Sequence, residues 1–121
     1  MESILRSVSA VRIFTRDLDR AREFYADVLA LAQQSDGPGY AVFDLAGVNV
    51  ILEAIEPDDP EGNELVGRLL ATSFHVDDVD AAYRTLMARG VRFVQPPEKQ
   101  DWGGKLAFAS DPDDNIITLV D

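Results

Sequence analysis

VRIFTRDLDRAREFYADVLAL, residues 11–31, reads as a short apolar strand followed by an acid-capped helix, and TSFHVDDVDAAYRTLMARGVR, residues 72–92, reads the same way. The two stretches align when Asp17 is placed on Asp78, 61 positions later (78 − 17 = 61). A repeated supersecondary unit in a chain this short predicts two similar modules that pack together and enclose a space.

The first half carries turn and capping signals between segments of distinct apolar periodicity. Its predicted elements are a strand at 8–15, a helix at 18–30 capped by Asp17 or Asp19, a turn at 35–39 and a hairpin of strands at 40–45 and 48–54. Residues 55–69 contain acids, prolines and glycines, which are typical of an exposed linker.

The second half repeats this order. Its predicted elements are a strand at 70–76, a helix at 79–89 that stops at Gly90, a short strand at 91–94, a loop from Pro96 to Gly104, and strands at 105–110 and 116–120. The predicted order of each half is βαβββ. The prediction is one α+β domain, residues 1–121, whose modules at 8–54 and 70–121 form a cupped, partly open mixed β-sheet with the helices outside.

Composition excludes several function classes. The chain has no cysteine, so it has no disulfide framework, thiolate nucleophile or cysteine-bound metal. The net charge of −11 disfavours nucleic acid and anionic membranes, and favours either plain solubility or a cationic ligand. No long apolar segment or basic leader is present, so we expect a soluble, cytoplasmic protein. No P-loop, dinucleotide motif or serine nucleophile motif occurs either.

These phrases resemble the vicinal oxygen chelate superfamily, which contains glyoxalase I, extradiol dioxygenases and the bleomycin-resistance binding proteins. Residues 11–31 resemble its opening signature, while FHVDDVDAAYRTLMARGVRF and WGGKLAFASDPDDNIITLVD resemble its second half. The resemblance covers nearly the whole chain and implies a homodimer. Ala30 and Asp114 stand where the family usually has glycine, so Asp114 must adopt whatever backbone angle its turn demands.

The resemblance also identifies the positions where catalytic members hold a divalent metal through His, Gln or Glu. Here these positions are Ala10, Ile51, Ala71 and Thr118, with Glu53 in place of Ile51 if the strand register shifts by two. Alanine and isoleucine have no donor atom, and a lone hydroxyl is a poor ligand. His75 and Glu53 alone fall short of the three protein ligands of a catalytic zinc site. The resemblance therefore implies a cup without metal or other cofactor.

The candidate ligand-binding residues lie on the predicted inner face or on the glycine-flanked loop. Arg12 either pairs with Glu53 or holds an anionic group, and His75 is either a donor facing the ligand or a histidine bonded locally at a strand end. Trp102 is either a lid that stacks on a ligand or an anchor for its loop. The full set is Arg12, Phe14, Tyr40, Ile51, Glu53, His75, Trp102, Phe108 and Thr118.

Three functions remain open. The first, favoured by the missing metal ligands, is a binding protein similar to those of bleomycin resistance, which would hold a small cationic or aromatic molecule. The second is a metal-dependent lyase or dioxygenase. The third is a structural or regulatory subunit whose cup is filled by its own side chains. No catalytic residue is assigned.

Overall fold

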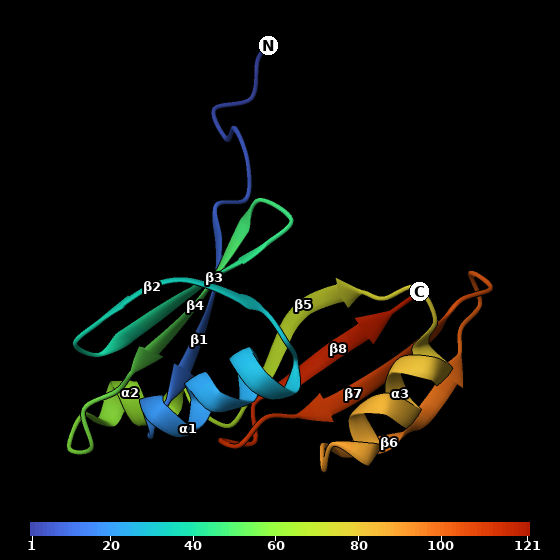
Figure 1. Ribbon diagram of the computed structural model, residues 1–121. Helices are drawn as coiled ribbons and strands as arrows, with labels where there is room; N and C mark the ends of the chain where they lie inside the picture. Colours follow the sequence, from blue (N-terminus) through green and yellow to red (C-terminus); the bar gives the residue numbers. More distant parts are fainter.

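The computed structural model describes residues 1–121 and shows the repeat directly (Figure 1). The first module contains β1 (Ala10–Thr15), α1 (Leu18–Glu23), the π-helical turn η1 (Phe24–Val28), β2 (Ala32–Gly37), β3 (Tyr40–Leu45) and β4 (Val48–Ala54). The linker contains a short helix, α2 (Pro60–Glu64). The second module contains β5 (Leu69–His75), α3 (Val79–Ala88), β6 (Arg92–Lys99), β7 (Lys105–Ser110) and β8 (Ile116–Val120).

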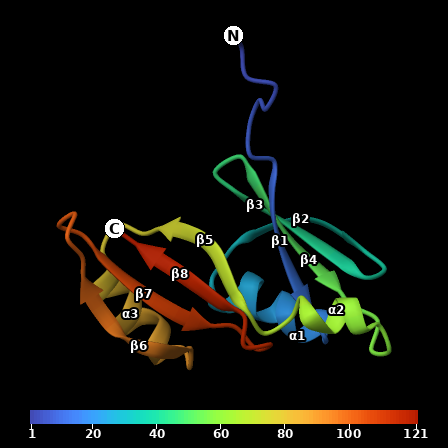
Figure 2. The same ribbon diagram turned by 180° about the vertical axis from the view of Figure 1, so that it is seen from behind.

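Each module forms its own four-stranded sheet with the same topology. The strand orders are β1-β4-β3-β2 and β5-β8-β7-β6, and in each sheet the first pair is parallel and the other two pairs are antiparallel. Helices α1 and α3 lie on one side of the two sheets, and the other side is free of them (Figures 1 and 2). This confirms the α+β class, the βαβββ order and the expected hairpin of β3 and β4.

The two helices begin where the sequence predicts. The carboxylate of Asp17 accepts a hydrogen bond from the backbone N–H of Arg20 at 3.1 Å, and that of Asp78 accepts one from Ala81 at 3.1 Å. Both residues are extended, as N-caps are. The first helix ends at Val28 rather than at residue 30, because its last turn is π-helical.

Two strands extend over residues that we expected in a turn or a loop. β2 runs through residues 35–37, which we expected in a turn, and β6 continues through Pro96 and Pro97 to Lys99. Both are edge strands, β2 is exposed along nearly its whole length, and proline is tolerated at a sheet edge. β2 and β6 are positioned by backbone pairing with β3 and β7. Such pairing does not require alternating apolar side chains, so the sequence of these strands does not reveal them. Helix α2 within the linker was likewise not predicted.

One hydrophobic core is shared by the two modules. Ile13 and Leu52 from the first sheet lie in the same cluster as Ile117 and Leu119 from the second. Phe24 and Tyr25 from η1 pack edge to face within that cluster, with their ring centroids 5.1 Å apart. The helix side of the sheets is therefore the closed side, and alternate strand residues point to the opposite, open side.

Two residues outside the helices and strands adopt a backbone conformation that favours glycine. Ala30 has φ = 59°, and Asp114 has φ = 63°, at the two positions where the family usually has glycine. We expect Ala30→Gly to raise the free energy of unfolding by about 0.5–1 kcal/mol, because glycine carries no steric penalty there and loses only part of that gain to its freer unfolded state. The matched control is Ala26→Gly inside η1, which should lower the free energy of unfolding by about 1 kcal/mol. Both variants are measured by urea titration. Equal effects of the two substitutions would contradict the prediction.

Candidate functional site

The open side of the first sheet carries four of the candidate residues. Ile13 and Thr15 are buried toward the helices, so Arg12 and Phe14 point the other way. In β4, the same alternation places Ile51 and Glu53 on this side. We call the helix-free side of both sheets the cup face. Strand register then brings Arg12 beside Ile51 and Phe14 beside Glu53.

Arg12 and Glu53 form a two-point ion pair on the cup face. Arg12 Nε donates to Glu53 Oε2 at 2.6 Å, and Arg12 Nη2 donates to Glu53 Oε1 at 3.0 Å. The guanidinium carbon also lies 5.3 Å from the centre of the Phe14 ring. The hydrogen bond to Glu53 raises the pKa of Arg12 above its ordinary value, so the guanidinium keeps its positive charge. The pairing that the sequence left open therefore forms.

This ion pair remains accessible from solvent. The side chain of Arg12 is 61% exposed and that of Glu53 is 27% exposed. Tyr40 lies beside Glu53 in the β3–β4 register and is 41% exposed. An aromatic ring, a cation and a carboxylate are thus presented together. Such a cluster has the chemistry to engage a flat ligand by stacking and a charged ligand through either partner of the pair.

The second sheet supplies a less polar part of the cup face. Ser73 lies beside Thr118 in the β5–β8 register, and Phe108 lies beside Thr118 in the β7–β8 register. Thr118 is buried, with 8% of its surface exposed, and Phe108 is partly buried. These residues offer hydroxyl groups and an aromatic surface, but no charge.

The register also resolves which residue of β4 corresponds to Thr118. Ile51 pairs with Arg12, and Thr118 pairs with Ser73, which is 61 positions after Arg12 (73 − 12 = 61). Ile51 is therefore the structural counterpart of Thr118, and Glu53 is the counterpart of Val120, the neighbour of His75. The shift that would have put Glu53 at the metal-ligand position is not observed.

The four family metal positions do not fit a metal ion. Ala10, Ile51 and Ala71 have no donor atom, and Thr118 provides one neutral hydroxyl. No three His, Asp or Glu side chains gather anywhere in the chain in an arrangement that would hold an ion. The donor chemistry on the cup face is that of an ion pair and hydroxyl groups.

His75 and Trp102 are exposed and form no hydrogen bond or ion pair with Arg12 or Glu53. His75 ends β5 with a side chain that is 73% exposed, and its Nε2 is 3.9 Å from an Asp77 carboxylate oxygen. Trp102 is 62% exposed in the turn that Gln100 and Gly104 close through a 2.8 Å backbone hydrogen bond. A Cβ added to Gly104 would lie 2.7 Å from Trp102 Nε1, so the indole rests against its own loop. Neither residue contributes to the group around Glu53.

Buried polar residues join the two modules, and the sequence did not single them out. The Asp111 carboxylate, in the turn between β7 and β8, accepts hydrogen bonds from the Tyr25 hydroxyl at 2.7 Å and from the backbone of Asp113 and Asn115 at 2.8 and 3.0 Å. Asp113 in turn accepts one from Thr15 at 2.5 Å. Aspartates in the phrase SDPDDN predicted a turn, but nothing local indicates which of them is buried.

Burial dominates the ionisation of this cluster. It raises the pKa of Asp111, against the opposing effect of hydrogen bonds from Asn115 and Tyr25. Burial and the neighbouring Asp111 charge raise the pKa of Tyr25 well above its ordinary value, so its hydroxyl keeps its proton and donates. The cluster therefore fixes the relation between η1 and the second sheet, and with it the relation between the two halves of the cup face.

Of the candidate residues, only His75 lines either of the two principal cavities. The better enclosed one, of about 430 Å³, is lined largely by apolar side chains of η1, α3 and the adjoining strands. The other is formed around the end of α3 and the start of β6. On the cup face of a single chain, Arg12 and Tyr40 are exposed to solvent.

Comparison with known proteins agrees with this geometry. The chain is 30% identical to the uncharacterized protein YraH of Bacillus subtilis, over 90% of this chain and 93% of that protein. It superimposes on a superfamily member from Sphaerobacter thermophilus with a TM-score of 0.80 and 29% identity, over 98% of each chain. It shares its fold with lactoylglutathione lyase from Agrobacterium tumefaciens, with a TM-score of 0.79 and 20% identity over 98% of this chain and 95% of that one.

No helix is long and apolar enough to cross a membrane. The family model that matches describes residues 7–119, almost the whole chain. The chain belongs to the Glyoxalase/Bleomycin resistance protein/Dioxygenase superfamily.

Proposed function

We propose that this protein binds a small aromatic cation on the cup face without a metal ion. The observation that carries the proposal is the accessible group of Glu53, Arg12, Phe14 and Tyr40. A flat ligand stacks on the aromatic rings, and its cationic group takes the place of the Arg12 guanidinium at Glu53. The net charge of −11 favours the approach of a cation over that of an anion.

The remaining candidates complete the pocket under this proposal. Ile51, Thr118 and Phe108 form its floor, while Trp102 closes over the ligand as its loop moves. His75 sits at the rim. We propose that the protein acts as a cytoplasmic homodimer, because a single chain leaves the cup face open.

The first test is calorimetric titration with aromatic amines, aromatic acids and aliphatic amines. We expect binding of aromatic amines alone, and a loss of about 10- to 100-fold in affinity for Glu53→Gln, since a hydrogen bond to a charged group contributes about 1.5–3 kcal/mol. The control is Glu56→Gln, which removes the same charge from an exposed position at the end of β4. If both variants lose the same affinity for aromatic amines, the loss reflects the net charge of the protein rather than a contact with Glu53, and the proposal is contradicted.

Bound metal is the second test. Elemental analysis of protein purified without chelator should show no stoichiometric metal, also after loading with Ni, Mn, Zn or Fe salts. One tightly held ion per chain would overturn the metal-free proposal and favour a lyase or a dioxygenase. If no member of the ligand panel binds, a structural or regulatory subunit becomes the better description.

A further inference from the structure

The better enclosed cavity, of about 430 Å³, lies between the two modules, and we call it the intermodule cavity. Its buried lining residues include Tyr25 and Val50 of the first module and Ile117 of the second, all of which belong to the shared core. In β4 and β8, Val50 and Ile117 alternate with Ile51 and Thr118 of the cup face, so the cavity lies on the opposite side of the sheets. Apolar side chains that are only partly buried form its walls, among them Leu29, Leu31, Phe74, Val76 and Ala82.

The walls of this cavity are held in place by contacts between the modules. The Tyr25 hydroxyl donates to the Asp111 carboxylate at 2.7 Å. Arg89, at the end of α3, donates through Nη1 to the Val28 carbonyl at 2.7 Å and so ties α3 to η1. Pockets that hold small molecules have volumes of about 300 to 1,000 Å³ and mainly apolar walls. The intermodule cavity has both properties, and a ligand with an apolar body would remove its apolar surface from water.

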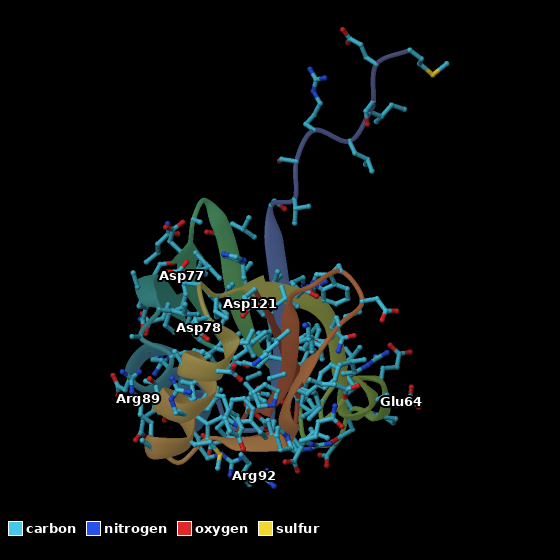
Figure 3. All side chains as sticks on the ribbon, turned by 90° about the vertical axis from the view of Figure 1, so that its right-hand side faces the viewer. Glu64, Asp77, Asp78, Arg89, Arg92 and Asp121 are labelled. Atoms are coloured by element: carbon cyan, nitrogen blue, oxygen red, sulfur yellow. The ribbon has the colours of Figure 1, made fainter.

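Negative charge gathers at one end of the cavity. Asp77 and Asp78 are its acidic lining residues, and neither lysine nor arginine lines it. The Asp77 side chain is fully exposed, and its ion-pair partner is His75, whose Nε2 is 3.9 Å from Asp77 Oδ1. Figure 3 shows Asp77 and Asp78 at this end of α3 and Arg89 at the other. The cavity therefore combines apolar walls with one acidic end.

The start of α3 does not present free backbone N–H groups to an anion. A helix N-terminus ordinarily attracts anions through such groups. Here the Val79 N–H donates to the Asp121 carboxylate at 2.8 Å, and Asp78 is the N-cap of the helix. The neighbouring cation, Lys105, forms an ion pair with Asp80. The charge that remains at this end is negative, so it attracts a cation and repels an anion.

We propose that the intermodule cavity binds a single-chain amphiphile with a quaternary ammonium head group. The chain lies against the apolar walls, and the head group lies near Asp77 and Asp78. Because Asp78 already accepts a hydrogen bond within its helix and Asp77 is exposed to water, this end attracts charge without requiring a hydrogen-bond donor from the ligand. The site is distinct from the one proposed on the cup face, which takes a flat aromatic cation. Short aliphatic amines cover too little of the apolar walls to bind in the cavity.

A chain-length series tests the apolar part of the proposal. The protein is titrated with butyl-, hexyl- and octyltrimethylammonium below the concentrations at which micelles form, and its backbone amide signals are followed by NMR. We expect the affinity to rise about fourfold for each added methylene, and the signals of Ala81, Ala82 and Thr85 to shift. Octanol should bind more weakly than octyltrimethylammonium, and octanoate more weakly still. An absence of binding, equal affinity for octanoate and octyltrimethylammonium, or shifts confined to the cup face would overturn the proposal.

Filling the cavity tests where the amphiphile binds. Thr85 is an exposed lining residue on α3. Thr85→Trp should weaken octyltrimethylammonium binding about 10-fold or more, because the indole covers apolar surface that the alkyl chain would cover. The matched control is Met87→Trp, at an exposed position on the same helix that does not line the cavity, and this variant should bind as the wild type does. Equal binding by the two variants would overturn the proposal. Titration of the Thr85→Trp variant with aromatic amines reports separately on the cup face, so the two proposed sites can fail independently.

Paired substitutions test the acidic end. Asp77→Asn with Asp78→Asn should lower the affinity for octyltrimethylammonium about 3- to 10-fold and leave the affinity for octanol unchanged, because asparagine removes the charges but still caps the helix. The control, Asp58→Asn with Asp59→Asn, removes the same charge from an exposed acid and the N-cap of α2 in the linker. This control should bind as the wild type does. If the two pairs of substitutions lose the same affinity, the head group does not lie near Asp77 and Asp78 and the proposal is wrong.

Discussion

Replacement of Asp111 by alanine is expected to lower the free energy of unfolding by about 4 kcal/mol, most of the stability of an ordinary domain of this size. The side chain is buried, with 2% of the residue exposed, and it accepts hydrogen bonds from four donors. Alanine leaves the Tyr25 hydroxyl, the Asn115 amide and two backbone N–H groups without their acceptor. Each unpaired buried group costs about 1–3 kcal/mol, reduced where water enters the space.

The measurement is chemical denaturation followed by circular dichroism. Tyr25→Phe should lose about 1–2 kcal/mol, because it removes one of the four donors. Asp58→Ala, at an exposed position in the linker, should change the stability by less than about 0.5 kcal/mol. A stability of Asp111→Ala within 1 kcal/mol of the wild type would mean that this cluster does not hold the modules together.

The predicted parts of the fold are those in which local chemistry alone determines the structure. Asp17 and Asp78 cap helices in almost any tertiary context, and the alternation in β1 and β4 requires one buried face. β2 has no such signal, since its residues AQQSDG show no apolar alternation and it is held mainly by backbone pairing with β3. Edge strands of this kind are determined by their neighbours, which the sequence of the strand itself does not show.

The candidate site was predictable to a similar extent. Strand alternation placed Arg12, Phe14, Ile51 and Glu53 on one face, and the structure has them there. It did not indicate the surroundings of Trp102 and His75, because loop and strand-end positions depend on tertiary packing. Asp111 was overlooked for the same reason. Its neighbours in SDPDDN have the same charge, and only the approach of Tyr25 from the other module distinguishes it.

Installing two histidines and two glutamates on the cup face is expected to create a metal site at four positions that lack adequate donors in the wild type. The substitutions are Ala10→His, Ile51→Glu, Ala71→His and Thr118→Glu. They occupy symmetry-related places, since Ile51 and Thr118 pair with residues two positions after Ala10 and Ala71. Two imidazoles and two carboxylates suit a divalent transition metal. We expect about one Ni²⁺ or Zn²⁺ per chain with a dissociation constant of roughly 1 μM or lower, against no saturable binding by the wild type at millimolar metal.

The same experiment decides whether one chain brings the two sheets into a common cup. A variant with only Ala10→His and Ala71→His keeps both imidazoles but lacks the carboxylates, and should bind at least 100-fold more weakly. If the four-residue variant folds and holds no ion, the positions on β1 and β4 do not meet those on β5 and β8, and the shared cup is wrong. If it binds one ion, the sheets of this chain have the geometry of a metal site, and the wild-type residues Ala10, Ile51, Ala71 and Thr118 are what keeps these positions from holding one. The Arg12–Glu53 pair is then the charged feature of that cup available to a ligand.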